Sequence, residues 1–125
     1  MYSDSKKIYD ESIKMHDEVM PMMGNIMKLQ AELKSIKEET TDTVMISTIN
    51  TTLQNLENAH KSMMYWMHHL TPIPNPDEIN SGQSGLPTEK EMLNIQKQSL
   101  EKIKKIKQET LESIDKAENL LSDLS

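Results

Sequence analysis

Residues 88–124 read TEKEMLNIQKQSLEKIKKIKQETLESIDKAENLLSDL, and this stretch decides the fold class. It opens with Thr88-Glu89-Lys90-Glu91, a capping box in which the first and last residues satisfy each other's backbone N–H groups. Apolar or small residues then recur at steps of three and four, the period of a helix that buries one face. The stretch therefore predicts a long amphipathic helix. Its seam consists of Met92, Ile95, Ser99, Ile103, Ile106, Thr110, Ile114, Ala117, Leu121 and Leu124.

Two earlier segments show the same spacing. The first holds its seam over about four heptads, through Ile8, Ser12, Met15, Val19, Met22, Ile26, Leu29, Leu33 and Ile36. The second carries Ile49, Leu53, Leu56, His60, Met63, Met67 and Leu70. Thr40-Thr41-Asp42-Thr43 interrupts the pattern between them, and Asp42 suits a helix N-cap. We expect a tight turn there and a helical hairpin. The alternative is one continuous helix, because neither Gly nor Pro enforces a stop.

Prolines and glycines mark the other breaks. Pro21 lies inside the first segment and removes one backbone donor, so we expect a kink or local break there. Residues 71–87 contain four prolines and all but one of the glycines, and we expect a stiff first half and a mobile Ser/Gly half. The chain is thus predicted to be all-α: a single domain of residues 1–125 that forms a three-helix up-down-up bundle. The helices span about 4–39, 42–70 and 88–124, with one long loop at 71–87.

The composition excludes several classes of function. The net charge is −6 and the cations are all lysine, so no nucleic-acid partner is expected. The apolar runs are too short to cross a bilayer, so no transmembrane segment is expected. Cysteine is absent from the sequence, which leaves no thiolate for catalysis or metal binding. There is also no Gly-x-Ser-x-Gly elbow or phosphate loop, and we expect a protein that is not an enzyme.

Histidine and methionine gather in two short stretches. One is His16-Asp17-Glu18-Val19-Met20-Pro21-Met22-Met23, and the other is His60-Lys61-Ser62-Met63-Met64-Tyr65-Trp66-Met67-His68. Together with Met15, Met27 and His69 they hold most of the eleven methionines and all four histidines, in a chain without phenylalanine. This concentration of thioether and imidazole favours one of two explanations, a flexible packing core or a site for a soft metal ion.

Spacing brings the two stretches to one height. In an antiparallel hairpin that turns near residue 41, His16 lies level with Trp66 and Met20 with Ser62. On the first helix His16, Met20, Met23 and Met27 share one stripe, and on the second helix His60, Met63, Met64 and Met67 lie close to the core line. With Met92, up to eight soft side chains are predicted to line one end of the bundle.

A soft metal ion suits this donor set. Thioether is a soft neutral ligand and imidazole a borderline one, so the expected ion is Cu(I), with Ag(I) following by analogy. The predicted ligands are His16, Met20, His60, Met64 and Met67, with Met23 and Met63 in reserve. Trp66 lies off this line and reaches the ion only if the helix end is rotated. Asp17 and Glu18 are expected to face water.

Other interpretations explain the same residues. A methionine stripe at helical spacing is more often core than ligand set, so a structural or protein-interaction bundle without a ligand is the main alternative. Haem binding through a His/Met axial pair is a minor one. A di-iron carboxylate site needs two Glu-x-x-His motifs, and only Glu57-Asn58-Ala59-His60 is present, so this class is excluded.

The two clusters also carry a family resemblance. At His16-Asp17-Glu18-Val19-Met20-Pro21 and at Met63-Met64-x-Trp66-Met67-His68 the chain resembles small helical lipoproteins of Bacteroidota, sometimes labelled "viral A-type inclusion protein". The resemblance covers the first two helices. It implies the mature part of a lipoprotein of the periplasm or cell envelope, held at the membrane by an N-terminal lipid that this sequence does not include. The family has no established activity to carry over, and the resemblance leaves the protein partner unknown.

Overall fold

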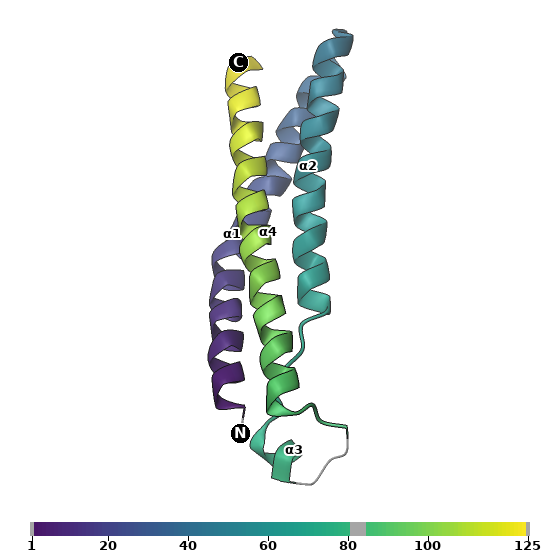
Figure 1. Cartoon of the computed structure of the whole chain (residues 1–125). Coiled ribbons are helices and arrows are strands. Elements are labelled where there is room, and N and C mark those ends of the chain that lie inside the picture. The colour runs from purple at the N-terminus through teal and green to yellow at the C-terminus, as the bar shows by residue number, and fades with distance from the viewer. Residues whose placement is uncertain (1, 81–84, 125) are drawn as a thin grey trace.

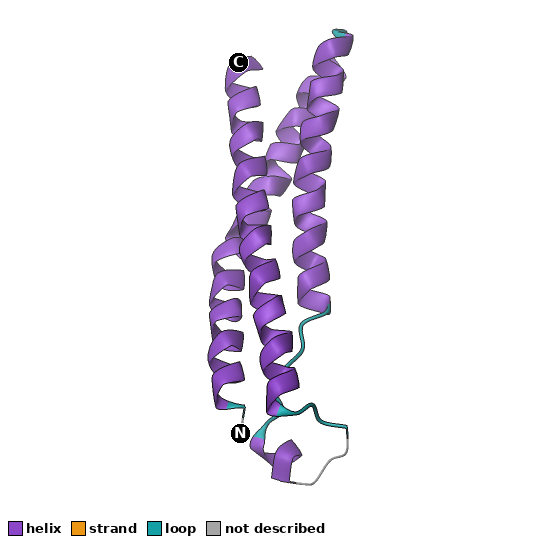
Figure 2. Ribbon diagram, in the orientation of Figure 1, coloured by secondary structure: helices purple, strands orange, loops and turns teal. Residues whose placement is uncertain are grey.

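The computed structural model describes residues 2–80 and 85–124. Within these ranges four helices form: α1 (Ser3–Glu39), α2 (Thr43–His68), α3 (Pro76–Asn80) and α4 (Glu89–Leu124). Figure 1 shows their order along the chain, and Figure 2 shows helices joined by loops, with no strand in the described part of the chain. The predicted all-α class is confirmed.

The three long helices pack against one another. α1 and α4 both begin near the N-terminal end of the molecule, and α2 runs back along the other side of α4 (Figure 1). In the same view α1 follows the first half of α4 and then leans behind it towards α2. Each of the three pairs of long helices is in contact. The core therefore lies on the common axis of α1, α2 and α4.

The predicted helix starts are confirmed by their hydrogen bonds. Asp42 Oδ1 accepts from the backbone N–H groups of Val44 at 3.0 Å and Met45 at 3.2 Å, which caps α2. At the start of α4, Thr88 N donates to Glu91 Oε1 at 3.2 Å and Glu91 N donates to Thr88 Oγ1 at 3.1 Å. The chain turns between Glu39 and Thr43, so the alternative of one continuous helix is wrong.

The segment predicted as one long loop contains a short helix. Pro76 begins α3, where a missing N–H costs nothing, and Asn75 Oδ1 accepts from Glu78 N at 2.8 Å. The Asn-Pro start signal was present in the sequence, but a five-residue helix has no apolar period to reveal it. The expected mobility of the Ser/Gly half falls mainly on residues 81–84, which lie outside the described residues. Pro21 does not break α1, which is helical on both sides of it.

The buried face of α2 is rotated from the predicted seam. Six residues of this helix are buried: Ile49, Thr52, Leu56, Ala59, Met63 and Trp66. Leu53 and His60 are half-buried instead, and Met67 is exposed. The reason is that α2 packs against both α1 and α4, so two neighbouring helices set its buried face and one apolar stripe does not.

The first turns of α4 show a similar shift. Gln96 and Leu100 are buried, whereas the predicted Ile95 and Ser99 are half-buried. The buried amide of Gln96 donates to the carbonyl oxygen of Thr71 at 2.8 Å and contacts Met92 Sδ at 3.3 Å. This bond ties the chain leaving α2 to α4. The amide nitrogen of Gln96 thus has a backbone acceptor inside the protein, whereas its Oε1 has no hydrogen-bond partner among the described residues.

Thr110 offers a direct test of core polarity. Its side chain is fully buried in α4, and its Oγ1 has no hydrogen-bond partner among the described residues. Thr110→Val keeps the shape and removes the unpaired hydroxyl, so we expect the free energy of unfolding to rise by about 1 kcal/mol in urea titrations. Thr52→Val is the matched control, because Thr52 Oγ1 donates to Thr48 O at 3.0 Å. A loss of stability in Thr110→Val equal to that in the control would contradict the prediction.

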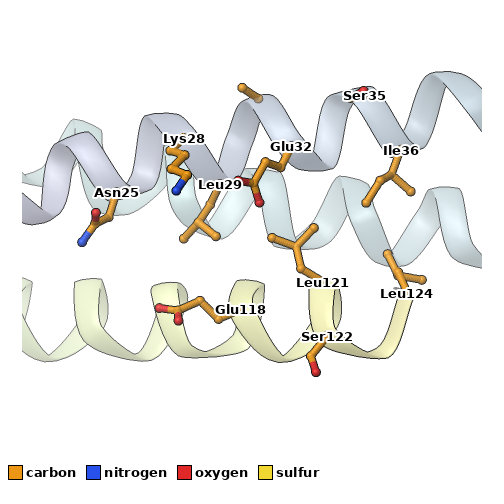
Figure 3. A pocket seen from close by; sticks show the side chains of 11 residues that line it. Asn25, Lys28, Leu29, Glu32, Ser35, Ile36, Glu118, Leu121, Ser122 and Leu124 are labelled. Atoms are coloured by element: carbon orange, nitrogen blue, oxygen red, sulfur yellow. The ribbon is translucent and has the colours of Figure 1, made fainter.

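An open groove of about 1030 Å³ lies between the second half of α1 and the last turns of α4. Figure 3 shows Leu29, Ile36 and Leu121 in the space between the two helices, with Lys28 and Glu118 at its edge. None of the described residues that line it is a histidine or a methionine. This groove is therefore separate from the two clusters that the sequence singled out.

One ion pair fastens α1 to α4 near the first cluster. Lys107 Nζ lies 2.9 Å from Glu18 Oε2. The hydrogen bond from Lys107, followed by its positive charge, lowers the pKa of Glu18 below the usual 4.5, so this carboxylate stays ionised at neutral pH. Glu18 is exposed to water, as expected, and also forms this surface ion pair with Lys107. Among the described residues, no helix combines the length and the apolar character needed to cross a membrane.

Candidate metal centre

His16 is the most unusual polar side chain of the first cluster. Its side chain is 18% exposed, and its Nδ1 lies 3.2 Å from Asp17 Oδ1. Its other ring nitrogen, Nε2, is buried and has no hydrogen-bond partner in the described part of the chain. An unpaired buried nitrogen costs about 1–3 kcal/mol, so its presence calls for a reason.

The contact with Asp17 determines which nitrogen carries the proton. A carboxylate only accepts hydrogen bonds, so in the neutral ring Nδ1 is the donor and Nε2 keeps its lone pair. Histidines that bind metal ions in proteins usually show this arrangement, in which a carboxylate orients the ring. Asp17 is 71% exposed, so it faces water as expected and also holds the imidazole of His16. In the sequence this contact is indicated by Asp17, which directly follows His16.

Trp66 stacks on His16. The ring centroids are 5.8 Å apart and the planes differ by 24°, which confirms that His16 of α1 lies level with Trp66 of α2. Trp66 is 5% exposed, and its Nε1 donates to the carbonyl oxygen of Ser99 on α4 at 3.0 Å. The prediction that Trp66 points off the shared line is therefore wrong, because the buried face of α2 is rotated towards it.

Met20 and Met64 share helical stripes with residues that contact the partner helix. Met20 follows His16 by about one turn, and His16 stacks on Trp66 of α2. Met64 follows Glu57 by about two turns, and Glu57 Oε2 accepts from Gln30 of α1 at 3.2 Å. Helical spacing thus places both thioethers on the sides of α1 and α2 that carry these contacts.

The two contacts between α1 and α2 also set the register of that interface. His16 with Trp66 and Gln30 with Glu57 place Met20 level with residues 62–67 of α2, and His60 level with residues 22–27 of α1. His16 and His60 thus lie about 9–16 Å apart along the bundle axis, at 1.5 Å per residue. The register therefore places His60 further from His16 along the axis than Met67 is, and a role for His60 as a ligand of the same ion stays a prediction.

The seven predicted ligands therefore occupy different environments. Met20, His60 and Met64 are half-buried, and Met67 is 38% exposed. By the same register Met67 lies level with His16, whereas Met20 lies about 6 Å further along α1 and Met64 about 3–10 Å further along α2.

The two reserve residues are core side chains. Met63 is fully buried and Met23 is 5% exposed, and both belong to the main hydrophobic cluster. Met20 packs against the same cluster from its edge. Met92 of α4 is also buried, so methionine fills the core at three positions, which is the packing role that the alternative without a ligand gives it.

Within the described ranges, no group of three or more His, Cys, Asp or Glu side chains is placed to hold a metal ion. A site at this interface thus depends on thioether sulfur in addition to His16. Neither a scan against models of known families nor searches of curated proteins and of solved structures found a match to the chain.

Proposed function

We propose that this chain binds a soft metal ion, Cu(I), between α1 and α2 and performs no catalysis. His16 Nε2 anchors the ion, and Met20, Met64 and Met67 supply thioether sulfur. The observation that carries the proposal is the buried Nε2 without a hydrogen-bond partner, on a ring whose other nitrogen is held by Asp17. His60, about two to three helical turns from His16 along the axis, is not among the ligands in this proposal.

The chemistry of these donors favours Cu(I) over harder ions. Thioethers are neutral and soft, and several must converge for useful affinity, whereas Zn²⁺ prefers imidazole, thiolate and carboxylate. Trp66 covers one side of the His16 ring and limits the access of water. The scaffold in this proposal is an up-down-up bundle of α1, α2 and α4, in which the two ligand-bearing helices are antiparallel.

We place this function in the periplasm or cell envelope. The resemblance of the two clusters to envelope lipoproteins supports that location, as does a donor set without thiolate in a compartment where thiols oxidise. Membrane attachment through an N-terminal lipid is part of the same proposal.

The test is a competition titration. The metal-free protein is mixed with Cu(I) and a coloured Cu(I) chelator without oxygen, and the chelator's absorbance gives the free ion. We expect saturation at one ion per chain, with an affinity well above that of free methionine at the same thioether concentration. Silver(I) supplies a second readout, because it is diamagnetic and shifts the NMR signals of the His16 ring. Binding no tighter than that of free methionine would refute the proposal.

A structural bundle without a ligand is the second candidate. The burial of Met23 and Met63 in the main core favours it, because those thioethers already have a packing role. This candidate predicts weak copper binding and a stability that copper does not change. A protein partner whose binding survives chelation and removal of His16 would support it.

A further inference from the structure

A second groove lies on the other side of Trp66, between α2 and α4. It encloses about 650 Å³, within the range of small-molecule sites, and α2 and α4 run side by side there (Figure 1). The residues that matter to its chemistry are Lys61, Tyr65, Trp66, His69, Lys102 and Lys105. None of the three lysines belongs to the metal proposal.

Aromatic rings on α2 form one wall of this groove. Tyr65 and His69 are stacked, with centroids 3.8 Å apart and planes 19° from parallel. His69 Nδ1 lies 2.9 Å from the carbonyl oxygen of Tyr65, which holds the stacked pair in place. Tyr65 is nevertheless 63% exposed, an unusual position for a large aromatic ring. The wall is thus preorganised and open to a flat ligand.

The charge in the groove opposes that of the whole protein. Three lysines and one carboxylate, Glu109, line it, although the chain carries a net charge of −6. Lys105 reaches Glu109 only at 3.9 Å, with its side chain 78% exposed, so this pair is weak. Lys102 has no ion pair in the described part of the chain. Lys61 lies 3.9 Å from Glu57 Oε1 with its side chain 69% exposed, so this pair is weak as well, and the ammonium groups are available to an incoming anion.

We propose that this groove binds a small aromatic carboxylate, whose ring lies against Tyr65 and Trp66 and whose carboxylate lies among the lysines. Lysine is a point charge that accepts a single carboxylate without the bidentate geometry of arginine. The apolar side chains Ile95 and Ile106 of α4 line the groove opposite the aromatic wall, which suits a ring and not a bare inorganic anion.

The test uses 3-phenylpropionate as the probe and the full chain with a metal chelator present, so that its outcome is independent of copper. Trp66 is the sole tryptophan, so its fluorescence reports on the groove directly. We expect a saturable change in Trp66 fluorescence with 3-phenylpropionate. The neutral 3-phenylpropanamide is expected to bind at least about fivefold more weakly. Added salt is expected to weaken the binding of the carboxylate. Equal binding of acid and amide, or no saturable change, would overturn the proposal.

Variants locate the charge. Lys102→Gln with Lys105→Gln is expected to weaken the binding of 3-phenylpropionate about tenfold. Lys97→Gln with Lys104→Gln removes the same charge from α4 outside the groove lining. This double variant is expected to change the affinity for 3-phenylpropionate by less than about twofold. Equal losses in the two double variants would overturn the proposal. The same saturable fluorescence change with inorganic phosphate would also overturn the proposal, because phosphate has no ring.

Discussion

Trp66→Ala is expected to lower the free energy of unfolding by about 3–5 kcal/mol, the largest effect of any single change here. The indole is 5% exposed and joins all three long helices, because it belongs to α2, stacks on His16 of α1 and donates to Ser99 O of α4. Its removal leaves a cavity where the three helices meet. Total stabilities of small domains are about 5–15 kcal/mol, so the variant will be at best marginally folded.

Circular dichroism in a urea titration measures this effect without relying on tryptophan fluorescence. Tyr65→Ala is the matched control, because it removes the neighbouring aromatic ring from the exposed side of α2 and is expected to cost under about 1 kcal/mol. Trp66→Phe keeps most of the apolar volume and loses the bond to Ser99, so we expect an intermediate loss. Equal losses in Trp66→Ala and Tyr65→Ala would show that Trp66 does not join the helices.

His16→Ala is expected to weaken Cu(I) binding by at least about tenfold in the chelator competition. The variant removes the nitrogen that anchors the ion, and it also removes an unpaired buried polar atom, so the fold is expected to survive. His68→Ala is the control, because His68 is exposed at the end of α2. An unchanged copper affinity in His16→Ala would show that His16 Nε2 does not bind the ion.

Asp17→Asn separates a metal role of His16 from a packing role. The amide no longer offers two acceptor oxygens to Nδ1, so the ring loses its fixed tautomer, and copper affinity is expected to fall about tenfold. Asp17 is largely exposed, so the free energy of unfolding is expected to stay within about 0.5 kcal/mol of the parent. A change in stability with no change in copper affinity would favour the packing role.

Local signals in the sequence were sufficient to predict the main helices and where they start. Asp42 and the Thr88/Glu91 box cap α2 and α4 because their side chains reach backbone groups only two or three residues away. The level pairing of His16 with Trp66 was also predictable, since an antiparallel hairpin with a short turn leaves one register. Helix α3 was missed, because a five-residue helix has too few residues for a period.

The geometry around the predicted ligands was only partly predictable. The sequence grouped His16 and His60 with their methionines, because a stripe along α2 gives direction and not distance, and the register places His60 about two to three helical turns from His16. The sequence also placed Trp66 off the shared line. Its burial involves α4, where the carbonyl oxygen of Ser99 accepts from Trp66 Nε1.

The sequence by itself determined the helices, their caps and the concentration of imidazole and thioether on α1 and α2. Those features follow from local hydrogen bonds and a period of 3.6 residues. Only the tertiary structure decided how far α2 is rotated about its axis, and so that the ring of Trp66 lies against His16. A rotation of this kind is the joint result of two neighbouring helices, and the apolar period of one helix alone does not contain it.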